Sequence, residues 1–384
     1  FLVEQGQGHK YSQLIGTFVV ESASNNEMTE TLQIIREGAV LYAGLNYSGD
    51  IAEKNQWNNT LKIYLETEIL FHIAGYNGEV FQDIAEDLLK LVQEMNKKRK
   101  KTIVLRYFPE TQDDIEKFFQ KAEDIIRGRD ICALNNYAMQ NILEGCKDVA
   151  DVIEKKARLY QLLKNKQICQ ENESRSYYED RNHVYNIQSE ELQRAYEIED
   201  EKIRYVTHLN YISILRKGEV SGELKNAKYI LLTETSKILK MANELAEDHQ
   251  VPLATNMYIL TNRLWYDLNK GFGAEDFPMT FDVLAKSQIV LSNILSAKVA
   301  DNFERVKHDF EEEKIGREEL VGNIIALREA AKKPEEITSD HIDEITGFIS
   351  EQEINIYKLE KEKLSSRVMT QDQQIEGFKR MLQN

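Results

Sequence analysis

Short apolar runs alternate with helix-length amphipathic segments between residues 61 and 128. The run 61–65 has the length and composition of a buried strand, and it is followed at once by two carboxylates, Glu66 and Glu68. Residues 81–95 carry apolar positions at helical spacing, and residues 102–105 form a second strand-like run. Alternating strands and helices of this kind predict a parallel sheet with crossover helices.

The same alternation returns between residues 201 and 270. A helix is predicted over 203–215, and it is expected to end near Gly218. Residues 228–233 are the clearest strand-like run in the chain, and a helix is predicted after it over 236–246. Residues 251–255 are expected to form a short edge strand, where Pro252 is tolerated.

A further helix is expected to open near Pro109, because proline suits the first turn of a helix. Thr111 and Asp114, three residues apart, predict a capping box at this start. Residues 130–170 have a helical pattern throughout, so the stretch 129–200 is predicted to be a helical insertion.

These patterns divide the chain into three predicted regions. Residues 1–60 are expected to be a helical segment, 61–300 an α/β domain containing the insertion, and 301–384 a helical extension. The last thirty residues carry a 3,4 heptad series, which predicts self-association or a partner helix through 354–384. A plain packed terminal helix is the alternative.

Composition narrows the class of protein. The net charge of −16 repels nucleic acid overall, so nucleic-acid binding would need a local basic face. Residues 97–101, which are all Lys or Arg, are the candidate, and a solvated helix C-terminus is the alternative. Three cysteines without CxxC spacing, no apolar run of 18 residues and no signal peptide predict a cytoplasmic protein without a membrane span.

Five short motifs, taken in order, resemble the PIN-like family of metal-dependent nucleases. They are Leu65-Glu66-Thr67-Glu68-Ile69-Leu70-Phe71, Thr111-Gln112-Asp113-Asp114-Ile115, Arg204-Tyr205 ahead of Leu215-Arg216-Lys217-Gly218, Leu232-Thr233-Glu234-Thr235, and Thr261-Asn262-Arg263-Leu264-Trp265. The resemblance covers roughly residues 60–300. It implies a Rossmann-like parallel sheet, with RNA or single-stranded nucleic acid as substrate.

The resemblance also implies a carboxylate site that holds Mg²⁺ or Mn²⁺ for phosphodiester hydrolysis. Glu66, Asp114 and Glu234 are the predicted catalytic metal ligands, with Glu68 as a further ligand. Tyr205 and Thr235 stand where the family has further acids, and Asp200 or Glu201 could lend another oxygen. Two hypotheses follow: a rearranged metal site in a ribonuclease, or a non-catalytic scaffold that assembles through its helices and has lost the metal.

Overall fold

A computed structural model describes residues 8–45, 57, 59–99, 102–130, 132–133, 136–172, 175–178, 183–187, 200–219, 221–247, 250–268, 270 and 277–349. The chain divides into two compact units. We call Glu30–Ala285 the sheet unit, and Phe1–Thr29 with Lys286–Asn384 the helical unit. The heptad residues 354–384 lie outside the described residues.

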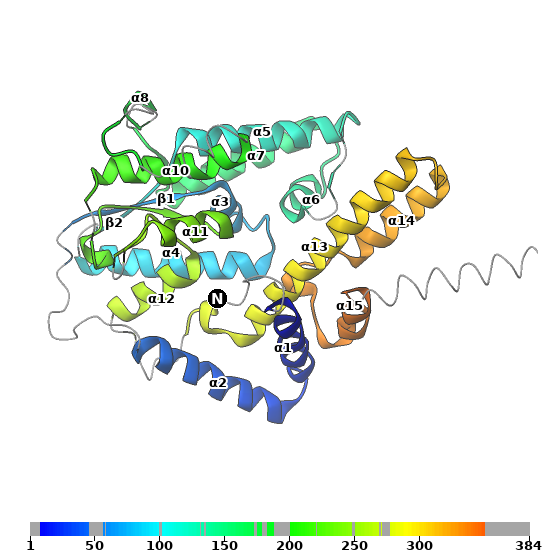
Figure 1. Cartoon of the computed structure of the whole chain (residues 1–384), viewed down its shortest axis with the longest axis horizontal. Helices are drawn as coiled ribbons and strands as arrows, with labels where there is room; N and C mark the ends of the chain where they lie inside the picture. The colour runs from blue at the N-terminus through cyan, green and yellow to red at the C-terminus, as the bar shows by residue number, and fades with distance from the viewer. Residues whose placement is uncertain are drawn as a thin grey trace, which may run out of the picture. The chain divides into compact units, whose positions relative to one another are not determined.

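The sheet unit contains a five-stranded, fully parallel sheet in the order β3-β2-β1-β4-β5 (Figure 1). The strands are β1 (Leu61–Leu65), β2 (Ile103–Tyr107), β3 (Cys169–Gln170), β4 (Tyr229–Leu232) and β5 (Ala254–Thr255). The predicted α/β class with a parallel sheet is confirmed. The predicted short edge strand at 251–255 is confirmed in its last two residues.

The central strand β1 pairs with β2 on one side and with β4 on the other. The chain moves outward from β1 to β2 and β3, and then returns across β1 to continue as β4 and β5. The strand order therefore reverses between β1 and β4. In open parallel sheets, ligands bind at the carboxyl ends of the strands beside such a reversal.

Helices cover both faces of this sheet (Figure 1). One face packs against α4 (Glu79–Arg99) and α12 (Met257–Asp267) through the side chains of Ile63 and Leu232. The opposite face packs against α10 (Asp200–Arg216) and α11 (Ser236–Glu244), where buried Tyr64 and Leu231 meet apolar side chains of both helices. The alternating direction of strand side chains explains why neighbouring residues enter different cores.

Two predictions about the region after β2 are wrong. The helix α5 (Pro109–Ile126) starts at Pro109, and its N-cap residue Phe108 makes no side-chain cap bond. Thr111 is therefore already inside the helix and is buried, so the predicted Thr111–Asp114 capping box does not form. Residues 130–170 are not one helix, because they contain α6 (Tyr137–Leu143), α7 (Val149–Asn165) and the edge strand β3.

The remaining helices are α1 (Gly8–Ser22), α2 (Asn26–Leu45), α3 (Thr67–Ile73), α8 (Arg175–Tyr178), α13 (Val283–Glu311), α14 (Arg317–Ala330) and α15 (Ile342–Ile349). Within the helical unit, α1 turns Gly16 toward Leu291 of α13, where an added Cβ would come within 3.2 Å of the leucine side chain. The predicted boundary at 300 falls inside α13. None of the helices in the described part of the chain has the length and hydropathy to cross a membrane.

Arg216, the last residue of α10, ties the amino ends of β4 and β5 together. Its guanidinium donates to the carbonyl oxygens of Tyr229 (2.7 Å), Val251 (2.8 Å) and Pro252 (2.8 Å). Burial lowers the pKa of Arg216 to about 10, so the side chain stays charged at neutral pH. One guanidinium thus serves the first carbonyl of β4 and two carbonyls in the segment that leads into β5.

We expect Arg216→Met to lower the free energy of unfolding by about 2–4 kcal/mol, because three charge-assisted hydrogen bonds are lost from a buried position. Urea denaturation measures this. Arg158→Met is the matched control, since Arg158 is exposed and pairs with Glu154 on the surface of α7. The control should cost less than about 1 kcal/mol. Equal losses in both variants would contradict the role given to Arg216.

Candidate acidic site at the sheet edge

Glu66 occupies the turn between β1 and α3, at the carboxyl edge of the sheet. Its backbone is extended, with φ −76° and ψ 165°, and its N–H donates to the Leu232 carbonyl of β4 at 3.1 Å. The side chain is at the N-cap position of α3 but makes no cap hydrogen bond. The carboxylate is thus free to turn away from the helix and to face neighbouring elements.

Both oxygens of the Glu66 carboxylate accept hydrogen bonds from other elements. Nδ1 of His208, on α10, lies 2.8 Å from Oε1, and the Thr233 hydroxyl, just after β4, donates to Oε2. Thr233 Oγ1 also accepts from the Thr235 backbone N–H at 3.0 Å, which leaves its own proton for Glu66. The orientation of Glu66 is therefore fixed from two sides.

Two further glutamates, Glu68 and Glu234, lie at the same edge of the sheet and have raised pKa values. Burial, and then the charge on Glu66, raise the pKa of Glu68 to about 7. Burial also raises the pKa of Glu234 to about 7. The Glu234 carboxylate accepts a hydrogen bond from the Met257 N–H at 2.8 Å, which lowers this pKa, whereas the charge on Glu68 raises it further. The Glu68 side chain keeps 49% of its surface exposed, so solvent screens part of the rise in its pKa.

The predicted ligands are thus only partly brought together. Glu66, Glu68 and Glu234 lie at one edge of the sheet, while Asp114 is half-buried on α5, which begins at the end of β2. Within the described residues, no group of three or more His, Cys, Asp or Glu side chains could hold a metal ion as it stands. The side chains of Tyr205, Asp200 and Glu201 lie outside the described residues.

His208 is the residue of the site that the sequence patterns missed. It lies among apolar positions of α10, which favours a core or surface role. In the structure it is buried, and its ring stacks against Phe108 at 5.7 Å between centroids. A polar residue on the buried face of a helix requires a hydrogen-bond partner, so the position of His208 among apolar residues could have indicated that it binds another polar side chain.

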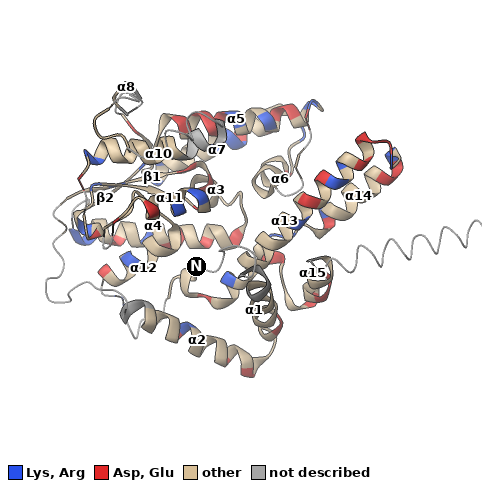
Figure 2. Cartoon of the chain, viewed as in Figure 1, with Lys and Arg blue, Asp and Glu red and all other residues tan. Residues whose placement is uncertain are grey.

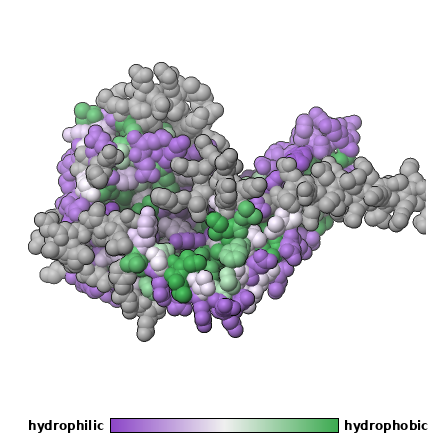
Figure 3. Space-filling model, turned by 60° about the horizontal axis from the view of Figure 1, so that its bottom comes forward, coloured by the Kyte–Doolittle hydropathy of each residue, from purple (hydrophilic) through white to green (hydrophobic). Residues whose placement is uncertain are grey.

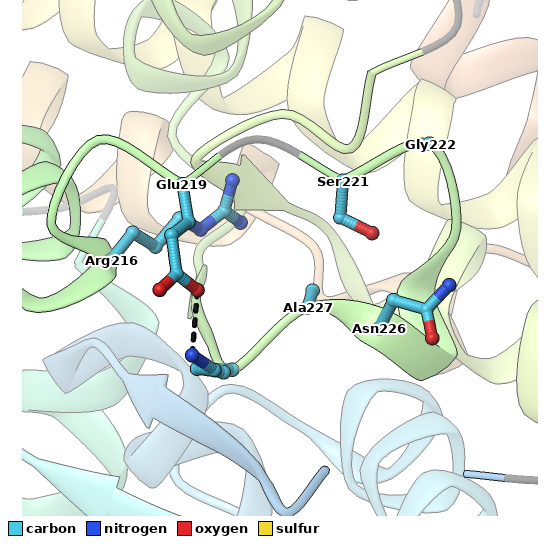
Figure 4. A pocket seen from close by; sticks show the side chains of 7 residues that line it. Arg216, Glu219, Ser221, Gly222, Asn226 and Ala227 are labelled. Carbon is cyan, nitrogen blue, oxygen red and sulfur yellow. Dashed lines mark hydrogen bonds and ion pairs between the residues drawn. The ribbon is translucent and has the colours of Figure 1, made fainter. Parts of the chain in front are cut away.

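Two other features lie away from these carboxylates. The basic residues at the end of α4 lie just before the start of β2, at the amino edge of the sheet (Figure 2). One of them, Arg99, donates to the Asp267 carbonyl at 3.0 Å. A cavity of about 290 Å³ also lies at the amino end of β4, where Lys228 pairs with Glu219 at 2.6 Å (Figure 4). Neither feature can contribute directly to the acidic site.

Comparisons of the chain with protein-family models, with curated proteins and with solved structures found no match. The class of protein that the structure defines is therefore an α/β protein with a five-stranded parallel sheet and an acidic site beside the reversal in strand order.

The raised pKa of Glu234 predicts a pH-dependent gain from Glu234→Gln. The folded-state pKa of about 7 lies above the ordinary 4.5, so the wild type loses stability relative to the variant as pH rises from about 4.5 to about 7. We expect the variant to gain about 1–3 kcal/mol more at pH 8 than at pH 5. Urea denaturation at both pH values measures this, with Glu304→Gln on α13 as the exposed control. A difference in unfolding free energy that stays the same at both pH values would contradict a pKa of Glu234 raised by burial.

Proposed function

We propose that this chain is a PIN-like α/β protein that hydrolyses phosphodiester bonds in RNA with the help of a divalent cation. The observation that carries the proposal is the position of Glu66 and Glu234, which follow the ends of β1 and β4 on either side of the reversal in strand order. Glu68 lies two residues after Glu66, in the first turn of α3. Three carboxylates at such an edge favour a cationic ligand.

The chemistry of these donors suits the cation that the resemblance implies. Carboxylate oxygens are preferred ligands of Mg²⁺ and Mn²⁺. A bound cation would stabilise the ionised forms of Glu68 and Glu234, whose pKa values are raised by burial first and by a neighbouring carboxylate second. A bound Mg²⁺ or Mn²⁺ would activate water and neutralise charge on the phosphate. Since the described carboxylates do not yet form a cage, at least one of them has to rotate when the cation binds.

The residues around the carboxylates have separate tasks in this proposal. His208 and Thr233 hold Glu66 in one orientation, so it supplies the fixed oxygen ligand. Glu234 is anchored by the N–H of Met257 at the start of α12. Burial, and then the charge on Glu234, raise the pKa of the Tyr258 hydroxyl, so Tyr258 lies near this carboxylate. An aromatic ring at this position suits stacking on a nucleobase.

We expect the wild-type chain to cleave labelled single-stranded RNA in the presence of Mn²⁺. Glu66→Gln should slow cleavage by about 100-fold or more, because it removes one charged ligand while keeping its shape. Glu304→Gln on α13 is the matched control and should cleave at the wild-type rate. Equal cleavage by the wild type and Glu66→Gln would show that the activity does not arise at this site.

A non-catalytic scaffold is the second candidate, and an exposed apolar stripe on α2 favours it. Ile34 and Tyr42 are 68% and 72% exposed, and Ile35 and Leu41 lie beside them on the same face. Gly38 lies at the middle of the stripe, and an added Cβ there would meet nothing within 4 Å. Apolar side chains gather on the face of the molecule that is brought forward in Figure 3. A contiguous exposed stripe of this kind suits contact with another helix.

The scaffold hypothesis predicts assembly in solution. We expect the full chain to elute above its monomer mass of 44.7 kDa in sizing experiments with light scattering. Ile34→Glu together with Tyr42→Glu should reduce the mass if α2 forms the contact, and removal of 350–384 should reduce it if the heptads do. A monomeric wild-type chain would refute self-assembly by either route.

A further inference from the structure

The carboxylates of Glu66 and Glu68 differ in how firmly they are held. Glu66 accepts two hydrogen bonds, one from His208 and one from Thr233. Within the described part of the chain, the Glu68 carboxylate accepts no hydrogen bond. Nε2 of His72 lies 3.9 Å from Oε1 of Glu68. That distance is too long for a hydrogen bond but short enough to be closed by a side-chain rotation.

His72 lies one helical turn after Glu68 on α3 and is almost completely buried, with 2% of its surface exposed. Its ring stacks on Phe81 of α4 at 4.5 Å between centroids. Burial lowers the pKa of His72 to about 3, so the imidazole stays neutral at physiological pH. A neutral imidazole carries one proton, and its neighbours decide which nitrogen holds it.

Contact with Asn77 determines which nitrogen of His72 carries the proton. Its side-chain nitrogen lies 3.0 Å from Nδ1 of His72 and also donates to the Glu68 backbone carbonyl at 3.4 Å. Because the same nitrogen serves both contacts, it is the donor and Nδ1 of His72 is the acceptor. The proton of His72 therefore lies on Nε2. Among the residues that the structure describes, this buried N–H group has no hydrogen-bond partner, and Oε1 of Glu68 lies 3.9 Å from its nitrogen.

We propose that His72 is a positioning residue of the acidic site, whose Nε2–H donates to the Glu68 carboxylate when that side chain rotates toward it and so holds Glu68 in place for a bound cation. The inference rests on the proposed function. One oxygen of Glu68 would then be held by His72 and the other would face the cation, as His208 and Thr233 already hold Glu66. A donor that fixes a carboxylate ligand in this way typically changes cation affinity by 10- to 100-fold.

Two variants of the full chain test this role. His72→Phe keeps a ring that can stack on Phe81 but has no donor, whereas His72→Gln keeps an N–H near the position of Nε2. We expect His72→Phe to weaken Mn²⁺ binding by about 10-fold, and His72→Gln to restore affinity to within about threefold of the wild type. Titration calorimetry measures the affinities, and thermal unfolding checks that both variants are folded. Wild-type affinity in folded His72→Phe overturns the proposal.

A second measurement leaves His72 in place and needs no cation. In protein labelled with ¹⁵N-histidine, the Nε2–H resonance of His72 should differ at pH 8 between the wild type and Glu68→Gln, because only an ionised carboxylate draws the proton strongly. Identical resonances overturn the proposal. If the wild type binds no Mn²⁺ while the resonances differ, the proposed hydrolytic function fails and the contact between His72 and Glu68 stands.

Discussion

The parallel pairing of β1 with β4 is the constraint on which the acidic site depends. The Lys62 N–H donates to the Lys228 carbonyl at one end of this pair, and the Glu66 N–H donates to the Leu232 carbonyl at the other. These bonds fix the register, with Leu65 opposite Leu232, so both strands end at the same level. A shift of one residue would turn Glu66 toward the other face of the sheet. This register sets how the ends of β1 and β4, and with them Glu66 and Glu234, lie relative to one another along the edge of the sheet.

The packing against α10 then converts this register into a defined geometry. The ring of Tyr64 stacks on Phe108 at 4.2 Å, with 9° between the ring planes, and Phe108 in turn supports the ring of His208. The packing of α10 thus places the imidazole of His208 beside Glu66. On the other side of the site, the short helix α3 leaves Glu68 without a hydrogen-bond donor in the described part of the chain, while His72 keeps an unused one. One half of the site is thus held by hydrogen bonds to Glu66, whereas the Glu68 carboxylate in the other half accepts none from the described residues.

The sequence patterns predicted much of the sheet unit because they depend on short-range periodicity. The strands at 61–65, 103–107 and 229–232 are short runs rich in Ile, Leu, Val and Tyr, and α4 and α5 have regular amphipathic spacing. The two-residue strand β3 was missed, since it is too short to show a period and follows a strongly helical segment. The capping box at Thr111 was wrong because Pro109 starts the helix two residues earlier. The exposed stripe on α2 could not be predicted either, because helical spacing identifies an apolar face without showing whether anything covers it.

For the site, the sequence by itself determined which carboxylates follow strands, and therefore that Glu66, Glu68 and Glu234 share one edge of a parallel sheet. The tertiary structure alone decided that His208, 142 residues away, would hold Glu66, and that His72 would present its proton toward Glu68. The physical reason is the range of the two kinds of interaction. Strand and helix preferences act between residues a few positions apart, whereas a buried imidazole finds its partner only after the sheet and its covering helices have packed together.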